Sequence, residues 1–397
     1  MSIRRGVVTE RSSTSARPIR VSSTLPIALV VTSNIQAGIY CFDSPRDAIE
    51  STYFAGHIEG NMLKYLELGD EQFPCIVPTI ISVANIVIEE EGVATAEEAA
   101  AQTKTNIINA TNALKFAAGT VNLASSTQSA VGFKPDIVAV CDYAIGDMDV
   151  ANAIISVCDA IKARTFIDLD ADTNGDAIAK RNSFGSDRVT LAKTSLGIWN
   201  TEESITDMYD SGVVLAWLRC YTDGSGQTGY AKSISNRVLP VSSVKSPSQF
   251  YPGKLDETDP LTEKQIMSFI SYKGIRTWEY ATTDVDPIWQ DARRVRIFDL
   301  AAEAVLDGIF WAIDKDLSEL KSAKDSLTAF MDSLVGDDVM LGFSVELDEE
   351  RTTPVRITAG EFYFIIDCQE VPSPRLISVR FNRVDRYAPL VYETLAV

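Results

Sequence analysis

The chain has 397 residues, of which 46% are hydrophobic and 23% charged, and this length allows two or more domains with separate cores. Its net charge of −19 argues against general nucleic-acid binding, because contacts to phosphates require clustered Lys and Arg. No apolar run is long enough to span a bilayer and no signal-peptide pattern opens the chain, so we expect a protein made in the cytoplasm.

The first third of the chain predicts an arm followed by strands and a helix. Residues 1–20 are polar and rich in Ser, Thr and Arg, which predicts an arm that does not fold on its own. The apolar run 27–32 predicts a strand buried on both faces. The run 75–83 predicts a strand at a sheet edge or with a bulge, because Pro78 cannot donate a ladder hydrogen bond. The Ala-, Lys- and Glu-rich stretch 96–118 predicts a helix.

The middle of the chain shows the clearest local pattern. A strand at 136–141, an amphipathic helix at 149–164 and a second strand at 165–170 have the spacing of a βαβ unit, in which the two strands are parallel. The sequence therefore predicts an α/β region.

The last third predicts a connection, a long helix and terminal strands. Residues 241–262 hold three prolines and several serines, which indicates a connection between domains. The stretch 291–315 predicts an amphipathic helix. Apolar and polar residues then alternate in 356–368 and 375–381, which predicts strands. The predicted apolar stripe of the helix consists of Val295, Phe298, Ala302, Leu306, Ile309 and Ile313.

Two glycine- or aspartate-containing motifs match ligand-binding patterns only in part. Gly224, Gly226 and Gly229 have the G-x-G-x-x-G spacing of a dinucleotide loop, but no helix start follows and no acidic residue stands at the distance needed to bind a ribose. Residues 170–175 match the first half of an EF-hand calcium loop, but its twelfth position, which requires Glu, is Arg181. Neither motif predicts a cofactor or a metal.

The histidine and cysteine residues of the chain also provide few candidates for catalysis or metal binding. His57 is the only histidine, and it lies in a polar, glycine-flanked segment typical of a surface turn. The six cysteines include no C-x-x-C pair, which favours reduced, buried thiols, while cross-links between subunits stay open as an alternative. We therefore predict no catalytic residue, no metal and no cofactor.

A competing interpretation is a soluble α/β enzyme that uses the βαβ unit. Its site would lie beyond the carboxyl ends of the strands, near Cys141, Asp142, Asp168 and Asp170. The absence of a usable histidine, a metal cluster or a phosphate-binding loop argues against this interpretation.

Several segments, in chain order, resemble contractile tail sheath proteins, in particular the compact sheaths of P2-like phages and pyocin-like tails. The most specific of them, "GVVLAWLRCYTDGSGQTGYAKSISNRVLP", is similar to a sheath signature of a small-residue helix, a turn and an aromatic-Ala-Lys-Ser segment. Its Ile234 departs from the proline that is common in the family. The segments that carry the resemblance are 6–34, 44–56, 212–240, 272–305 and 359–391.

The resemblance implies a multidomain α/β and α+β fold with extended terminal arms. An outer α/β domain is expected at 21–250 and an α+β assembly domain at 251–377, with linking arms at 1–20 and 378–397. It also implies a non-enzymatic structural subunit that forms stacked hexameric rings around a tail tube and contracts to drive the tube through a cell envelope. The implied location is the tail of a phage virion or of another injection particle, assembled in the host cytoplasm.

The implied partners are copies of this chain, the tail tube protein, and baseplate and tail terminator proteins, without nucleic acid and without membrane insertion. In such sheaths the arms of neighbouring subunits add strands to a sheet of the next subunit. Ordinary pairing within one chain is the alternative. The arm residues expected to pair between subunits are Val7, Val8, Leu376, Ile377, Val379, Leu390, Val391 and Tyr392.

Three arginines, Arg293, Arg294 and Arg296, stand close together at the start of the long predicted helix. Positive charge is disfavoured at this end of a helix by the helix dipole. The arginines therefore predict a surface that faces an acidic partner, either the tube or a neighbouring subunit. The alternative is local pairing with the nearby carboxylates of Asp284, Asp286 and Asp291.

Overall fold

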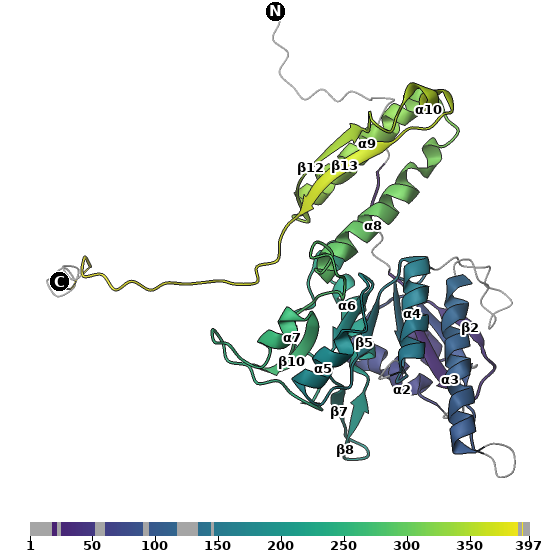
Figure 1. Cartoon of the computed structure of the whole chain (residues 1–397), viewed down its shortest axis with the longest axis vertical. Coiled ribbons are helices and arrows are strands. Elements are labelled where there is room, and N and C mark those ends of the chain that lie inside the picture. The colour runs from purple at the N-terminus through teal and green to yellow at the C-terminus, as the bar shows by residue number, and fades with distance from the viewer. Residues whose placement is uncertain are drawn as a thin grey trace, which may run out of the picture.

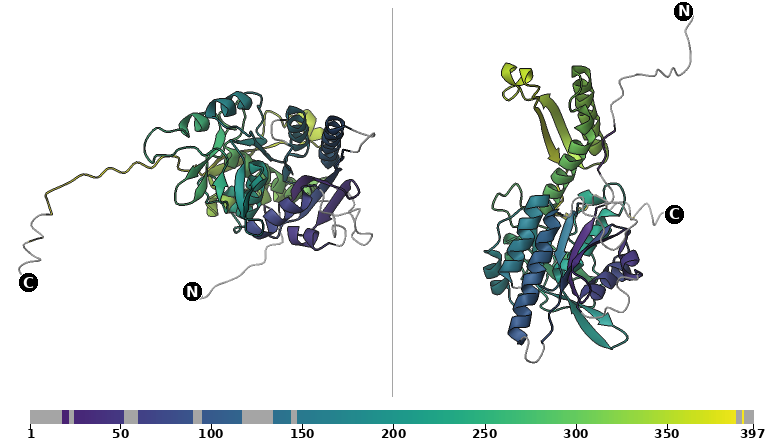
Figure 2. Two further views of the ribbon diagram at one scale, coloured as in Figure 1. Left: turned by 90° about the horizontal axis from the view of Figure 1, so that it is seen from below. Right: turned by 90° about the vertical axis from the view of Figure 1, so that its right-hand side faces the viewer.

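The computed structural model describes residues 18–21, 25–51, 60–89, 95–116, 134–143, 147–387 and 391. These residues form an α/β unit, which ends near Gln290, and a narrower α+β unit, which starts at Asp291 and projects from it (Figures 1 and 2). An extended segment, residues 371–387, leaves the α+β unit and points away from both units (Figure 1). We call it the C-terminal arm. His57, Val7, Val8, Leu390 and Tyr392 lie outside the described residues.

The centre of the α/β unit consists of two four-stranded sheets that meet edge to edge. Their strands are β1 Ile27–Ser33, β2 Gly38–Phe42, β3 Thr79–Asn85, β4 Ile137–Val140, β5 Thr165–Asp168, β6 Val189–Ala192, β10 Ile266–Ser271 and β11 Ile275–Trp278. The order is β2-β3-β1-β4 in one sheet and β5-β6-β10-β11 in the other, and a parallel bridge between Ile137 and Arg164 connects them. The outermost strands, β2 and β11, run antiparallel to their neighbours, and the pairs between them are parallel.

Helices cover both faces of these sheets, as parallel strands buried on both sides require. One face carries α3 (Ala96–Ala113), α4 (Met148–Ile161), α5 (Asn174–Arg181) and α7 (Asp259–Glu263). The other carries α1 (Pro45–Ile49), α2 (Met62–Glu67) and α6 (Ser211–Asp223). Successive residues of β1 point into the two cores, so that Leu29 packs with α2 and α6 whereas Val30 packs with α3 and α4.

Local sequence chemistry explains where these helices begin. Thr95 and Glu98 form a capping box at the start of α3, in which each side chain binds a backbone N–H group of the other residue. The Asp147 side chain accepts hydrogen bonds from two backbone N–H groups at the start of α4. None of the helices in the described ranges is both long and apolar enough to cross a membrane.

The α+β unit consists of two helices packed on a hairpin. Its elements are α8 Ala292–Ile309, α9 Leu317–Gly336, β12 Met340–Leu347, α10 Pro354–Thr358 and β13 Phe364–Glu370. Ile297 and Leu300 of α8 meet Leu327 and Phe330 of α9 in its core, which also contains Ile19 from the start of the described chain. The predicted α/β region and α+β C-terminal part are confirmed by these two units. The predicted βαβ unit is confirmed as well, because β4, α4 and β5 follow one another and the two strands are parallel.

Some predicted elements differ from the structure. β3 is an inner strand between β1 and β2, because Pro78 precedes it and only contributes its carbonyl oxygen to the Ile27 N–H group. Residues 241–262 do not connect domains. They contribute β9 (Ser243–Val244) to a small sheet with β7 (Leu196–Asn200) and β8 (Ile205–Tyr209), and they include α7. The predicted boundary at 250/251 therefore falls inside the α/β unit.

The apolar stripe predicted for the long helix is only partly buried. Val295 is buried, but Leu306 and Ile313 are 63% and 62% exposed, and the buried side consists of Ile297, Leu300 and Ala304. The helix carries apolar residues on more than one side, and its outer half projects beyond the α/β unit (Figure 1). The predicted strand 375–381 has no strand partner among the described residues, so it runs as extended chain.

Candidate assembly interface

The hairpin of β12 and β13 is a sheet of only two strands. The strands pair in antiparallel register, with Phe343 opposite Cys368 and Leu347 opposite Phe364. No other strand in the described part of the chain pairs with the outer edge of either one. Isolated two-stranded sheets are marginally stable, and their unpaired N–H and C=O groups are ready to pair with another chain.

The face of this hairpin that packs on the helices is incompletely covered. Its apolar side chains are partly exposed, in contrast to β1, β4, β5 and β6 of the α/β unit, whose residues are all buried. A strand added at either edge would remove more of this apolar surface from water, which is favourable by roughly 25 cal/mol for each Å². The partly covered side chains are Phe343, Val345, Phe364, Ile366 and Cys368.

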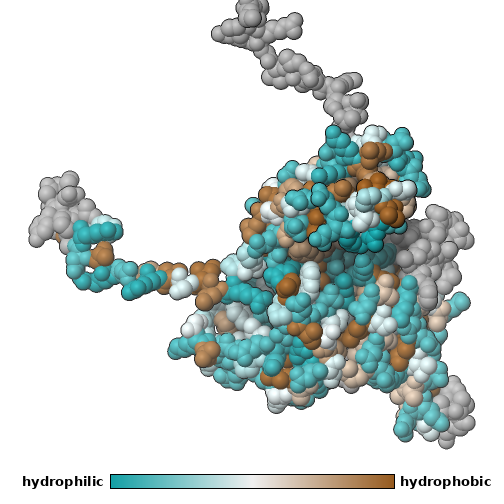
Figure 3. Space-filling view, turned by 45° about the horizontal axis from the view of Figure 1, so that its top comes forward, coloured by the Kyte–Doolittle hydropathy of each residue, from teal (hydrophilic) through white to brown (hydrophobic). Residues whose placement is uncertain are grey.

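The C-terminal arm has the pattern of a strand without a sheet. Ile377, Val379 and Phe381 are 77%, 68% and 93% exposed and occupy alternate positions, which lie on one side of an extended chain. Leu376, another predicted pairing residue, is 86% exposed. Figure 3 shows apolar side chains along the arm and on the α+β unit. Val391, also a predicted pairing residue, is 57% exposed. The residues on either side of it in the chain lie outside the described ranges.

The root of the C-terminal arm is bound to the start of α8. Arg293 donates hydrogen bonds from Nη1 to the carbonyl oxygen of Val371 (2.6 Å) and from Nε to that of Ala231 (2.5 Å). Arg294 forms an ion pair with Glu370, with 2.6 Å between Nε and Oε1. These two arginines therefore act within the chain, whereas the sequence predicted a surface facing an acidic partner.

Arg296 is buried at the junction of the two units. It is 1% exposed and forms ion pairs with Asp136 (2.7 Å) and Asp223 of the α/β unit. Burial disfavours its charge, but the two carboxylates outweigh burial and raise the pKa of Arg296. The predicted outward-facing role does not apply to a side chain in this position. The ion-pair partners of Arg294 and Arg296 are also not the nearby carboxylates named as the alternative, and Asp291 accepts hydrogen bonds from the backbone N–H groups of Arg293 and Arg294.

The glycine-rich loop after α6 is part of this junction. A Cβ atom on Gly229 would lie 2.1 Å from the carbonyl oxygen of Asp223, so only glycine allows the loop to pack so closely. Arg219 donates hydrogen bonds to the carbonyl oxygens of Gly229 (2.8 Å) and Lys232 (2.6 Å). Gly229 therefore belongs to a closely packed corner, whereas Gly224 and Gly226 lie in an exposed part of the loop.

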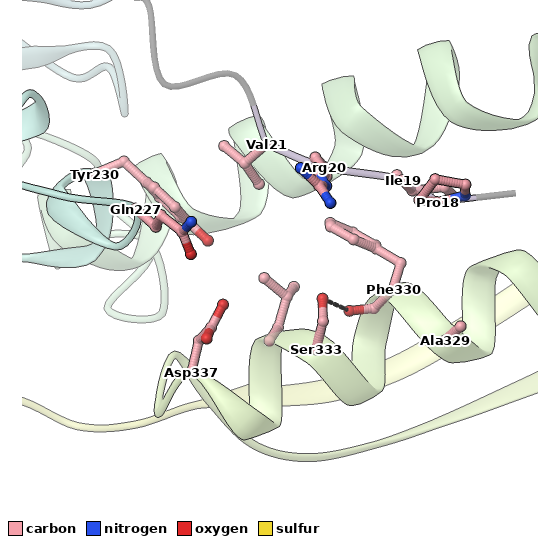
Figure 4. A pocket seen from close by; sticks show the side chains of 11 residues that line it. Pro18, Ile19, Arg20, Val21, Gln227, Tyr230, Ala329, Phe330, Ser333 and Asp337 are labelled. Carbon is pink, nitrogen blue, oxygen red and sulfur yellow. Dashed lines mark hydrogen bonds between the residues drawn. The ribbon is translucent and has the colours of Figure 1, made fainter.

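The start of the described chain packs on the two helices of the α+β unit. Ile19 is 7% exposed and lies against Gly308 of α8. Phe330 of α9 points toward the Pro18–Val21 segment, while Tyr230 lies on the far side of a pocket of about 570 Å³ (Figure 4). The remaining lining residues are Gln227, Ala329, Ser333, Leu334 and Asp337.

The residues named for the enzyme alternative hold structural elements together. Asp168 is fully buried and accepts hydrogen bonds from the Ser195 hydroxyl (2.8 Å) and the Ser211 N–H group (3.1 Å). Burial raises its pKa. Asp142 accepts a hydrogen bond from the Tyr65 hydroxyl, and Asp170 forms an ion pair with a lysine. Cys141 is buried. The described part of the chain contains no group of three His, Cys, Asp or Glu side chains arranged to hold a metal.

Comparison with known proteins shows what the α+β unit resembles. A model of the phage tail sheath C-terminal domain matches residues 284–382. The C-terminal part of the chain is thus similar to that domain. It is also 26% identical, over 244 residues, to a putative prophage major tail sheath protein of Pseudomonas aeruginosa (strain UCBPP-PA14), and the alignment covers 60% of this chain and 62% of that relative. The matched region thus spans less than two thirds of the curated relative.

Solved sheath structures share the fold over nearly the whole chain. The helical sheath of the anti-feeding prophage in its contracted state has a TM-score of 0.64 at 15% identity, covering 97% of this chain and 100% of that one. The contracted sheath of the extracellular injection system PVC has a TM-score of 0.64 at 13% identity, covering 97% and 98%. A sheath tail protein of Desulfitobacterium hafniense has a TM-score of 0.55 at 8% identity, covering 93% and 100%. The resemblance to contractile tail sheath proteins predicted from the sequence is confirmed.

Proposed function

We propose that this protein is a structural subunit of a contractile sheath, which polymerises in helical rings around a tail tube and contracts to drive the tube through a cell envelope. One observation supports this proposal most directly: the same chain contains a two-stranded sheet, the hairpin, and a strand-like segment without a partner among the described residues, the C-terminal arm. Among the described residues, neither outer edge of the hairpin of β12 and β13 has a strand partner, and the C-terminal arm exposes Ile377, Val379 and Phe381. Each subunit would complete its hairpin with arms from its neighbours.

Charge and length support a second copy of this chain as the partner of the arm. The arm carries four arginines and one aspartate, in a chain whose net charge is −19. The hairpin exposes Glu346 on β12 and Asp367 on β13. The predicted strand 375–381 has seven residues, as β13 has. A basic strand of matching length thus fits an acidic two-stranded sheet.

The remaining parts of the proposal follow from the sheath relatives. Leu376, Val391 and the N- and C-terminal residues Val7, Val8, Leu390 and Tyr392 would pair between subunits. The subunit would act without catalysis, in hexameric rings, with the tail tube, baseplate and tail terminator proteins as further partners. It would be part of the tail of a virion or of another injection particle assembled in the host cytoplasm.

Negative-stain electron microscopy of the concentrated, purified protein tests the proposal. We expect hollow cylinders of regular diameter from the wild-type chain. Replacing Ile377, Val379 and Phe381 together by serine should abolish the cylinders, because it removes the apolar side of the arm. The arm lies outside both cores, so far-UV circular dichroism of the variant should match the wild type.

A matched control changes the opposite side of the same strand. Arg380→Ser and Asn382→Ser keep the apolar residues, so cylinders should still form, with a stronger dependence on salt where the arginine is lost. Small particles of uniform size from the wild-type protein, even with tail tubes present, would contradict the sheath proposal. Cylinders from the triple-serine variant would contradict the role assigned to the arm.

A further inference from the structure

The N-terminal arm has a root that is seated on α8. At Gly308, a Cβ atom would lie 2.5–2.9 Å from three side-chain carbons of Ile19, closer than nonbonded carbons approach. Glycine at this position therefore makes the recess that holds Ile19 against the helix. Glycine is unfavourable in a helix by about 1 kcal/mol relative to alanine, so the recess has a local cost.

The C-terminal arm has its root near the other end of the same helix. Arg293 binds the carbonyl oxygen of Val371, and Arg294 binds the carboxylate of Glu370. The N–H group of Val371 also donates to the carbonyl oxygen of Val339 (3.0 Å). These three contacts hold Glu370 and Val371, where the chain leaves the hairpin.

We propose that α8 anchors the roots of both arms and keeps them at a fixed separation, with Gly308 and the pair Arg293–Arg294 as the two anchors. This inference rests on the proposed sheath function. From Arg294 to Gly308 the helix advances 14 residues, which is roughly 21 Å. An α-helix of this length is rigid, so it holds the two anchors at a fixed distance. Beyond its anchor, the C-terminal arm also contacts the α/β unit through the ion pair between Arg375 and Glu279 (3.5 Å).

Anchoring limits where the arms can reach. Val8 is eleven residues from Ile19, so a strand at Val7 and Val8 must pair within roughly 40 Å of Gly308. At the other root, Pro372 and Pro374 follow the anchor directly and stiffen the first residues of the arm. The positions of the two neighbours relative to each other are therefore set by one helix of the subunit between them.

Substitution at Gly308 tests the first anchor. Gly308→Ala should displace Ile19, so in dilute, unassembled protein trypsin should cut after Arg20 about fivefold faster, because proteolysis follows the population of the open form. The protein concentration at half-assembly should rise about tenfold. Gly336→Ala is the matched control, since a Cβ atom on this helical glycine meets nothing within 4 Å. It should leave both quantities at the wild-type value.

Two further variants keep the test decisive. Ile19→Ala alone should also speed cleavage after Arg20, because it removes the side chain that fills the recess at Gly308. Arg294→Gln should speed cleavage after Arg375 about fivefold, with Arg46→Gln, in an exposed pair with Glu50, as its control. Wild-type cleavage rates in Gly308→Ala and Arg294→Gln would overturn the proposal. Cleavage does not require assembly, so a wild-type protein that forms no cylinders would contradict the sheath function alone.

Discussion

The two units of the molecule differ in how far their strands are paired and buried within the chain. In the α/β unit the inner strands are paired on both sides and covered on both faces, and Ile81 of β3 is fully buried. In the α+β unit each strand of the hairpin has a described partner on one side only, and Ile366 of β13 is partly exposed. The two central sheets of the α/β unit thus bury their inner strands within one chain, whereas the hairpin of the α+β unit leaves its apolar side chains partly exposed in the described structure.

Breaking the junction between the units should have the largest effect. Arg296→Met removes the cation that pairs with Asp136 and Asp223, leaving buried carboxylates with less compensation. We expect the free energy of unfolding, measured with urea, to fall by about 3–5 kcal/mol. Arg46→Met, which breaks an exposed pair, should leave the free energy of unfolding close to the wild-type value. A similarly small change for Arg296→Met would mean that the junction does not depend on this ion pair.

The same substitution in the two units sharpens the comparison directly. Ile81→Ala should lower the free energy of unfolding by about 2–5 kcal/mol, because it leaves a cavity in a closed core. Ile366→Ala in the unassembled subunit should cost about 1 kcal/mol, since the side chain is only partly removed from water. Urea unfolding of both variants measures the difference. Equal costs in the unassembled subunit would contradict the view that the hairpin is incomplete.

The stability of the α/β unit should also depend on pH. Burial, followed by the charges of Asp168 and Asp142, raises the pKa of Asp210 well above its usual value, and burial also raises the pKa of Asp168. The folded chain therefore holds protons that the unfolded chain releases near pH 4. Their stabilisation is complete below that pH and is lost as pH rises through the raised pKa values, by up to about 1.4 kcal/mol per pH unit for each group.

Asp210→Asn removes one of these groups while keeping a residue that can cap α6, because asparagine also accepts the hydrogen bond from the Gly212 N–H group. Thermal unfolding of wild type and variant between pH 4 and pH 8 should show a flatter profile for the variant. Parallel profiles would contradict the raised pKa of Asp210.

Sequence patterns predicted those parts of the fold that depend on short-range order. β1, α3, and the β4–α4–β5 unit follow from apolar runs and helical periodicity, and the exposed alternation in residues 375–381 follows from period two. The prediction that β3 lies at a sheet edge or carries a bulge was wrong, because β3 is an inner strand. The effect of a proline depends on whether it precedes a strand or lies within it.

The contacts of the three arginines could not be predicted from neighbouring residues. Arg296 pairs with Asp136 and Asp223, which are 160 and 73 residues away in the chain. The recess at Gly308 likewise depends on Ile19, from the opposite end of the chain. A cluster of arginines in an acidic chain signals partners of opposite charge, but only the fold decides whether those partners lie inside the chain or on another molecule.

The open hairpin and the unpaired arm have a consequence that belongs to polymer chemistry. A chain that carries both an acceptor edge and a donor strand is a bifunctional monomer, and every addition regenerates the group that the addition consumed. Such a monomer contains no stop signal for growth. Under the proposed pairing, the length of the polymer is therefore set from outside, by molecules that offer an edge without a strand or a strand without an edge.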